Sequence, residues 1–132
     1  MKDLKQAGFK EASAEVVPRL IVAIDGLEKQ GKTHWALTAP DPIGLIDFDV
    51  GSEGVVSKFV KEEKKIMTVN IKVPETRADA AKSATEANAV WREFKAAYDY
   101  SLQNFRTTII DTATEAWELL RICLLYTSDA AD

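Results

Sequence analysis

The chain is poor in cysteine and in long hydrophobic runs, and each shortage excludes a class of protein. Cys123 is the only cysteine among 132 residues, so the chain has no internal disulfide and no metal site built from several cysteines. No apolar stretch approaches the ~20 residues that a helix needs to cross a bilayer. The N-terminal MKDLKQAGFKEAS lacks the apolar core of an export signal. We therefore expect a cytoplasmic protein without a membrane partner.

Excess charge of one sign is also missing. The formal net charge of −4 argues against an extended surface that coats nucleic acid, although it leaves room for a local basic groove. The length fits one domain at most, with enough apolar residues for a core and with no visible repeat or linker. Composition alone thus indicates an ordinary soluble domain.

One motif is present in complete form. Residues 26–33 read GLEKQGKT, which satisfies the phosphate-loop pattern GxxxxGK[ST]. The apolar run Leu20–Ile24 precedes it, and residues 20–25 have the pattern of a buried strand. Because this motif requires a strand before it and a helix after it, its setting supports a real phosphate-binding loop over a Gly-rich turn with a solvated lysine.

The spacing of the motif has a physical reason. The backbone must wrap around an anion with its N–H groups turned inward, and Gly26 and Gly31 permit that path. The helix start that follows offers unpaired N–H groups. Lys32 is placed to reach the β and γ phosphates of ATP, and the Thr33 hydroxyl is placed to bind Mg²⁺.

This interpretation assigns a nucleotide contact to the whole loop. The residues expected to bind the cofactor ATP are Gly26, Leu27, Glu28, Lys29, Gln30, Gly31, Lys32, Thr33 and His34. The side chain of His34 is expected to pack or to lie at the surface of a helix rather than to act as a catalyst. Trp35 is expected in the core, and its contact with nucleotide stays open.

Beyond the loop, strand patterns alternate with helix patterns. We expect strands at residues 20–25, 43–49, 67–73 and 107–111, and helices at residues 31–39, from residue 51, at 77–104 and at 113–121. The strand at 67–73 alternates in polarity and should lie at a sheet edge. The long helix should pack through one stripe, formed by Ala80, Ala84, Ala87, Trp91, Phe94, Tyr98 and Leu102. The fold class predicted is α/β, with a parallel sheet flanked by helices.

Acidic residues end two of the expected strands, at the edge of the sheet where α/β proteins bind ligands. Asp111 directly follows an apolar strand, which is the setting of a Walker B acid that helps to hold Mg²⁺. Capping of the next helix is its competing role. With the phosphate loop upstream, we favour the metal role, so Thr33 and Asp111 are the expected metal residues.

A second acidic group lies in the string LIDFDVGSEG. Hydrolysis needs a carboxylate near the water that attacks the γ phosphate. Asp49 is the best candidate because it lies beyond the last buried residue of the strand, whereas Asp47 is expected to be partly enclosed and Glu53 to lie on the next helix. Asp49 is equally suited to cap that helix. The expected catalytic residues are therefore Lys32 and Asp49.

Taken together, the segments GLEKQGKT, PDPIGLIDFDVGSEG and TTIIDTATEAWELL resemble the phage and prophage RecA-like P-loop ATPases, often labelled AAA-family ATP-binding proteins. The resemblance spans residues 19–121, and the first segment is its most specific part. It implies a RecA-type parallel sheet, ATP with Mg²⁺, and hydrolysis coupled to DNA recombination. It also implies single-stranded DNA as a partner of the full-length protein, in a phage or its bacterial host, while homo-oligomer assembly stays open.

The chain departs from that family in two respects. The family usually has a glutamate where this chain has Asp49, so the hydrolytic role of this shorter acid stays open. The last ten residues, CLLYTSDAAD, resemble translated sequencing adapter. We therefore expect a lead-in at residues 1–18, a partial P-loop domain at 19–122 that is incomplete at its C-terminus, and a non-native tail at 123–132. The missing strand and DNA-binding loops would leave a gap in the sheet, so we expect poor folding or weak nucleotide binding.

Two other functions remain open from the sequence. A P-loop phosphotransferase for a small molecule would need arginines on a lid, and the available ones are Arg77, Arg92 and Arg106. A nucleotide-gated binding module would hold ATP without hydrolysing it, which the short acid Asp49 would suit.

Overall fold

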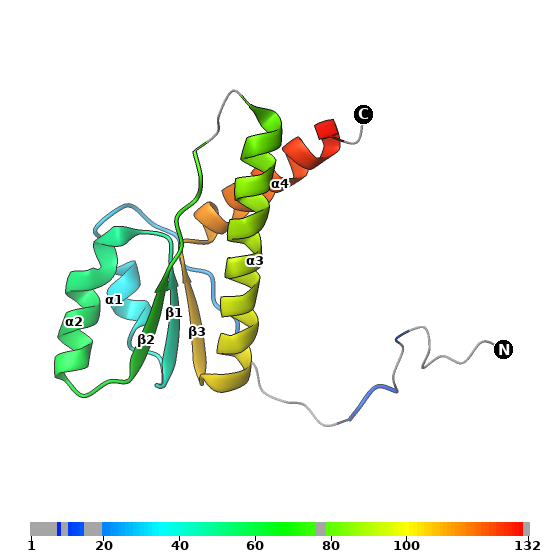
Figure 1. Cartoon of the computed structure of the whole chain (residues 1–132). Helices are drawn as coiled ribbons and strands as arrows, with labels where there is room; N and C mark the ends of the chain where they lie inside the picture. The colour runs from blue at the N-terminus through cyan, green and yellow to red at the C-terminus, as the bar shows by residue number, and fades with distance from the viewer. Residues whose placement is uncertain (1–7, 9–10, 15–19, 76–78, 131–132) are drawn as a thin grey trace.

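Three parallel strands form the centre of the fold. A computed structural model of the chain describes residue 8 and residues 11–14, 20–75 and 79–130. The strands are β1 (Ile43–Asp47), β2 (Ile66–Asn70) and β3 (Thr107–Asp111), and they pair in the order β2-β1-β3. At mid-strand, Leu45 of β1 lies opposite Thr68 of β2 and Ile109 of β3. All three strands therefore end at the same edge of the sheet, the upper edge in Figure 1.

Helices cover both faces of this sheet. The short α1 (Lys32–Ala36) and α2 (Glu53–Lys61) lie on one side, and α3 (Ala80–Asn104) with α4 (Ala113–Ala130) lies on the other (Figure 1). A 3-10 helix, η1 (Val50–Ser52), joins β1 to α2. The α/β class and the parallel sheet flanked by helices are thus confirmed.

Side chains of β1 point alternately to the two faces of the sheet, so the core consists of two clusters, one on each face. Ile43 and Leu45 pack with Leu37 and Phe59 on the side of α1 and α2. Ile46 points to the other side. Its cluster there contains Ile71, Ala87, Phe94, Leu119, Ile122 and Cys123. A strand that is buried on both faces explains why β1 reads as an apolar run rather than as an alternating one.

Gly44 brings α3 close to the sheet. A Cβ atom at this position would lie 2.3 Å from Oγ of Ser101 and 2.5 Å from Cδ2 of Phe105. The hydroxyl of Ser101 in turn lies 2.7 Å from Oγ1 of Thr108 on β3. The C-terminal end of α3 therefore rests directly on the backbone of β1, which fixes the helix against the sheet.

Several sequence expectations are confirmed. Strand β3 has the predicted bounds, and β2 lies at an edge of the sheet as predicted. The predicted strand at 43–49 ends earlier, at Asp47, and the one predicted at 67–73 covers Ile66–Asn70 instead. Helices α2, α3 and α4 occupy their predicted places. The predicted start of α3 at Arg77 lies outside the described residues. Within its stripe Ala87 and Phe94 are buried, whereas Leu102 is 57% exposed, because at the end of α3 the neighbouring Ser101 faces the sheet instead.

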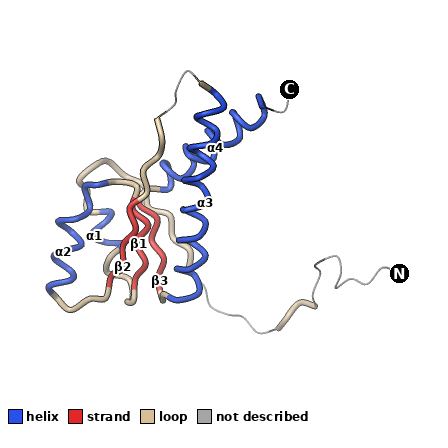
Figure 2. Tube along the Cα trace, viewed as in Figure 1, coloured by secondary structure: helices blue, strands red, loops and turns tan. Residues whose placement is uncertain are grey.

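The predicted strand at residues 20–25 is wrong. These residues form no strand, and Figure 2 shows them as loop. The exposed fractions of Leu20, Ile21, Val22 and Ile24 run from 43% to 93%. The apolar pattern indicates only a tendency, whereas a strand needs a neighbour for its backbone hydrogen bonds. In the described part of the chain, β1 pairs with β2 and β3, and none of the three strands pairs with this segment. Of the setting that the GxxxxGK[ST] motif requires, the structure therefore has the helix after the loop, α1, but not the strand before it.

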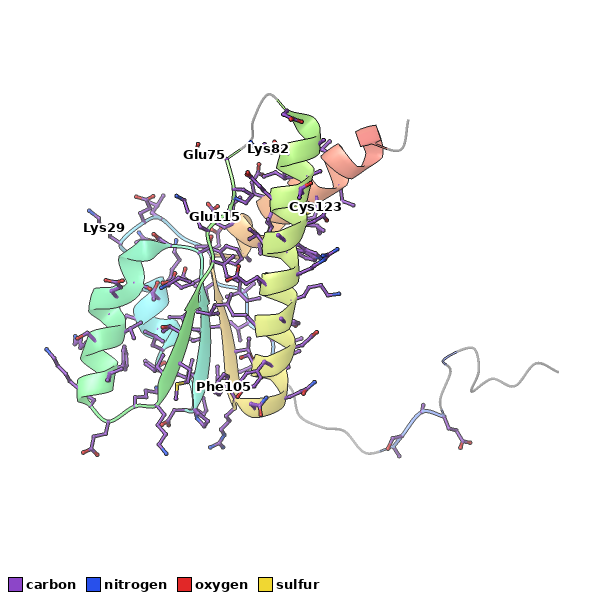
Figure 3. All side chains as sticks on the ribbon, in the orientation of Figure 1. Lys29, Glu75, Lys82, Phe105, Glu115 and Cys123 are labelled. Atoms are coloured by element: carbon purple, nitrogen blue, oxygen red, sulfur yellow. The ribbon has the colours of Figure 1, made fainter. Side chains whose placement is uncertain are left out.

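Two further expectations need correction or comment. Helix α1 is shorter than predicted, and Trp35 is 55% exposed instead of buried, because this single turn directs Leu37 into the core. The expected domain boundary after Ile122 falls inside α4, which continues to Ala130. Cys123 is buried in the cluster that joins α4 to α3 (Figure 3).

Candidate functional site

The segment GLEKQGKT, which has the phosphate-loop motif, begins as an open turn and leads into α1. Gly31 precedes the helix with φ of 82°, a left-handed conformation that favours glycine. At Gly26 a Cβ atom would lie 3.1 Å from Oε1 of Gln30, so a side chain there would crowd the loop. Residues 26–31 are exposed, and Lys29 projects outward from the loop (Figure 3). Both motif glycines thus occupy positions where the backbone path restricts a larger residue.

Lys32 turns back into this loop. Its ammonium donates hydrogen bonds to the carbonyl oxygens of Gly26 and of Leu27, the latter at 3.2 Å. The Leu27 amide donates to Oε1 of Gln30 at 3.2 Å, and the Gly26 amide donates to Oδ1 of Asp25 at 2.8 Å. The loop is therefore curled around the amine of Lys32, which has carbonyl oxygens as its partners.

Thr33 meets Asp111 across the fold. The Thr33 hydroxyl donates to Oδ2 of Asp111 at 2.9 Å, over a separation of 78 residues. Within the described part of the chain, this bond links the Asp111 side chain to the phosphate loop rather than to α4. The two residues expected to bind metal are thus in direct contact at the carboxyl end of β3.

The electrostatic surroundings of Asp111 disfavour its ionised form. Burial raises the pKa of Asp111 above its ordinary value of 3.8, and the nearby charges of Asp47 and Asp49 raise it further. The hydrogen bond from Thr33 and the charge of Lys32 act in the opposite direction on the same pKa. A cation placed beside Asp111 would relieve the repulsion among these carboxylates.

The turn after β1 carries the other two acids. Asp47 is 3% exposed, and its Oδ1 accepts a hydrogen bond of 2.8 Å from the Asp49 amide. Its Oδ2 accepts from the hydroxyl of Ser52. Asp49 is exposed, and its Oδ1 accepts from the Gly51 amide at 3.1 Å, which caps η1. The expected enclosure of Asp47 is confirmed, and the capping role considered for Asp49 is present.

The donor set at Thr33 and Asp111 fits Mg²⁺. This ion is usually held by one or two carboxylates, with phosphate oxygens and waters in its remaining positions. A hydroxyl and a carboxylate that already lie 2.9 Å apart would supply the protein oxygens. Among the described residues, no group of three or more His, Cys, Asp or Glu side chains is arranged to hold a metal.

The remaining predicted residues have ordinary places. The His34 ring packs against Phe59 of α2, with ring centroids 4.9 Å apart, which agrees with its expected packing role. Glu53 begins α2 and is exposed. Trp91 packs against the core cluster, and the Tyr98 ring stacks on Phe94 with centroids 6.0 Å apart. Of the residues expected to bind nucleotide, Gln30, Lys32 and Thr33 have side-chain hydrogen bonds within the described structure.

No protein-family model, curated protein or solved structure matches the chain. In the part of the chain that the structure describes, no helix has the length and apolarity to span a bilayer.

Two hollows of the described surface lie away from the loop. One, of about 360 Å³, is lined by Thr38, Asp41, Phe59 and residues 62–64. The other, of about 270 Å³, lies between α3 and the strands β1 and β2, where Met67, Tyr100 and Phe105 line it. Neither contains a residue of the phosphate loop, so the candidate site is the open end of the sheet rather than a closed cavity.

Sequence reasoning missed Ser52, the partner of Asp47. A signal for the burial of Asp47 was present, because Asp47 shares the inward period of two with Ile43 and Leu45. A buried carboxylate needs hydrogen-bond donors, and Ser52 is the hydroxyl residue in the turn that follows. The two observations together would have pointed to this pair.

Proposed function

We propose that this chain binds the phosphates of ATP together with Mg²⁺ and hydrolyses ATP as a P-loop ATPase. The contact between Thr33 and Asp111 carries the proposal. A threonine in a GxxxxGK[ST] loop and an acid at the end of a strand are the pair that holds Mg²⁺ in such enzymes, and their side chains lie 2.9 Å apart. Lys32 would bind the phosphates of ATP. Its amine now donates hydrogen bonds to the carbonyl oxygens of Gly26 and Leu27, and it would donate to phosphate oxygens instead.

The crowding of negative charge supports a cation at this place. Asp111 has Asp47 and Asp49 as acidic neighbours, and burial disfavours its charged form. Mg²⁺ held by Thr33 and Asp111 would offset that repulsion and would neutralise negative charge on the phosphates. Asp49 is exposed at the same edge of the sheet and would orient the attacking water.

A second candidate is a binding module that holds ATP without turnover. The observation that favours it is the hydrogen bond from the Gly51 amide to Oδ1 of Asp49, which uses this oxygen as a helix cap. The phosphotransferase alternative has less support, because Arg106 precedes β3 and so lies at the opposite end of the strand from Asp111.

Phosphate release from ATP tests the proposal. We expect Mg²⁺-dependent release by the wild-type chain and its loss in Lys32→Ala. Lys58→Ala is the matched control, because Lys58 is an exposed lysine on α2. Binding of ATP without release would favour the binding module. Absence of both binding and release would overturn the proposal.

The resemblance to phage RecA-like ATPases extends the proposal to DNA. We propose that single-stranded DNA stimulates the hydrolysis in the full-length protein, in keeping with a function in recombination or replication. The test is phosphate release with and without single-stranded DNA. A rate that DNA leaves unchanged would remove the DNA partner and would leave the nucleotide site untouched.

A further inference from the structure

The carboxylate of Asp47 is buried, and both hydrogen bonds that it accepts come from the turn after β1. Asp47 ends β1, is 3% exposed, and accepts from the Asp49 amide and from the Ser52 hydroxyl. Burial of an ionised carboxylate is unfavourable unless hydrogen bonds replace its water. Both oxygens have such a donor. The side chain therefore ties the first residues after β1 to the start of α2.

The same turn is also tied to the neighbouring strand. The amide of Phe48 donates to the main-chain oxygen of Asp111 at 2.6 Å. On the other side, the Ile71 amide donates to the main-chain oxygen of Asp47 at 2.9 Å. Phe48 and Asp47 are therefore held by β3 and by the chain after β2. Asp49 is the next residue, and its amide is the donor to Asp47.

Asp47 itself is poorly placed to contact a ligand. Its side chain is buried, and each carboxylate oxygen already accepts a hydrogen bond from the turn. Asp49, by contrast, is exposed at the carboxyl edge of the sheet, the edge at which Thr33 meets Asp111. The arrangement separates one acid that holds the turn from one acid that faces outward.

We propose that Asp47, with Ser52, is a positioning residue that fixes the turn after β1 so that Asp49 is directed to the water that attacks ATP. This inference rests on the proposed ATP hydrolysis. Its chemical basis is geometric: Asp47 acts on Asp49 through the hydrogen bonds that it accepts, and its side chain has no contact with the reacting atoms.

Two substitutions of Asp47 separate geometry from charge. In Asp47→Asn, the amide oxygen can still accept from the Asp49 amide, and the amide nitrogen can donate to Ser52, whose hydroxyl also accepts. Asp47→Ala removes both bonds. We expect kcat close to wild type for Asp47→Asn, and a fall of about 100-fold for Asp47→Ala, because small misplacements of a catalytic group have effects of this size. The Kd of ATP measured in EDTA should stay unchanged in both, because Asp47 is buried and its carboxylate oxygens accept hydrogen bonds within the turn.

Ser52→Ala is the second variant, since Asp47→Ala risks failing to fold. It should lower kcat while leaving the Kd of ATP unchanged. Ser101→Ala is its matched control, because Ser101 is also a buried serine with a side-chain partner, Thr108, but it lies away from the turn. We expect Ser101→Ala to lower the melting temperature without lowering kcat.

Each other result contradicts the inference. If folded Ser52→Ala and Asp47→Ala keep the wild-type kcat, the turn needs no such anchor. If Asp47→Asn loses as much kcat as Asp47→Ala, charge rather than geometry is responsible. If the Kd of ATP rises in step with the loss of kcat, Asp47 acts in binding. Wild-type phosphate release is measured first, and its absence would overturn the proposed hydrolysis and this inference together.

Discussion

The Thr33 hydroxyl donates a hydrogen bond of 2.9 Å to Oδ2 of Asp111, which lies 78 residues later in the chain. This contact joins the phosphate loop to the carboxyl end of β3. It also brings together the two residues that the sequence assigns to a metal.

Substitution of Asp111 should affect stability and binding in opposite directions. The pKa of Asp111 is raised, so above its folded-state pKa the ionised carboxylate disfavours the folded state. The contribution of Asp111 to the free energy of unfolding is most favourable below the ordinary pKa of 3.8. It is lost as the pH rises through the folded-state pKa of this carboxyl. We expect Asp111→Asn to raise the free energy of unfolding in urea at pH 7 and to weaken Mg²⁺-dependent binding of ATP.

The control for this prediction is Asp99→Asn, which changes an exposed acid on α3. It should leave both measurements near their wild-type values. At pH 3.5 the difference in stability between Asp111→Asn and wild type should shrink. A less stable Asp111→Asn at pH 7 would contradict the assigned surroundings of the acid.

Gly44→Ala should destabilise the contact between α3 and β1. The added Cβ atom would lie 2.3 Å from Oγ of Ser101, and overpacking of a core typically costs about 1–3 kcal/mol. Gly54→Ala is the matched control, because nothing lies within 4 Å of its Cβ position in α2. There the alanine should stabilise by about 0.5–1 kcal/mol. The free energy of unfolding in urea is measured for both variants. If Gly44→Ala and Gly54→Ala change it by the same amount, the described packing is contradicted.

The apolar segment before the phosphate loop should drive association of the isolated chain. Leu20 and Ile21 are 89% and 93% exposed, and contiguous exposed apolar residues favour aggregation. We expect Ile21→Lys to reduce the apparent mass seen by light scattering after size exclusion. Val60→Lys, which changes a single exposed residue on α2, should have little effect. A wild-type chain that is monomeric at high concentration would contradict this prediction.

Local sequence patterns predict those helices and strands whose side-chain pattern is strong. The strand Thr107–Asp111 was predicted with its full bounds, and the edge position of β2 followed from its alternating polarity. The stripe of α3 placed Ala87 and Phe94 in the core. In α3 the helical periodicity of the side chains indicated the buried face, whereas β3 is evenly half-buried and Met67 of β2 is exposed.

Other features depend on partners that a pattern does not specify. Residues 20–25 have an apolar run, but no described strand offers them hydrogen bonds. Trp35 was expected in the core, and the single turn of α1 leaves it outside. At the site, the motif predicted Lys32 and Thr33 as binding residues, and the strand end predicted Asp111. The role of Ser52 depends on a contact formed only after the turn has folded.

The most direct test of the central claim is calorimetric titration of the chain with ATP, in Mg²⁺ and in EDTA. We expect ATP to bind more tightly in Mg²⁺ than in EDTA. Thr33→Val, which removes the hydroxyl, should lose most of the Mg²⁺-dependent part, and Lys32→Ala should weaken binding by about 1.5–3 kcal/mol, the usual worth of a charge-assisted hydrogen bond. Binding that neither EDTA nor these two substitutions alters, or no binding at all, would contradict it.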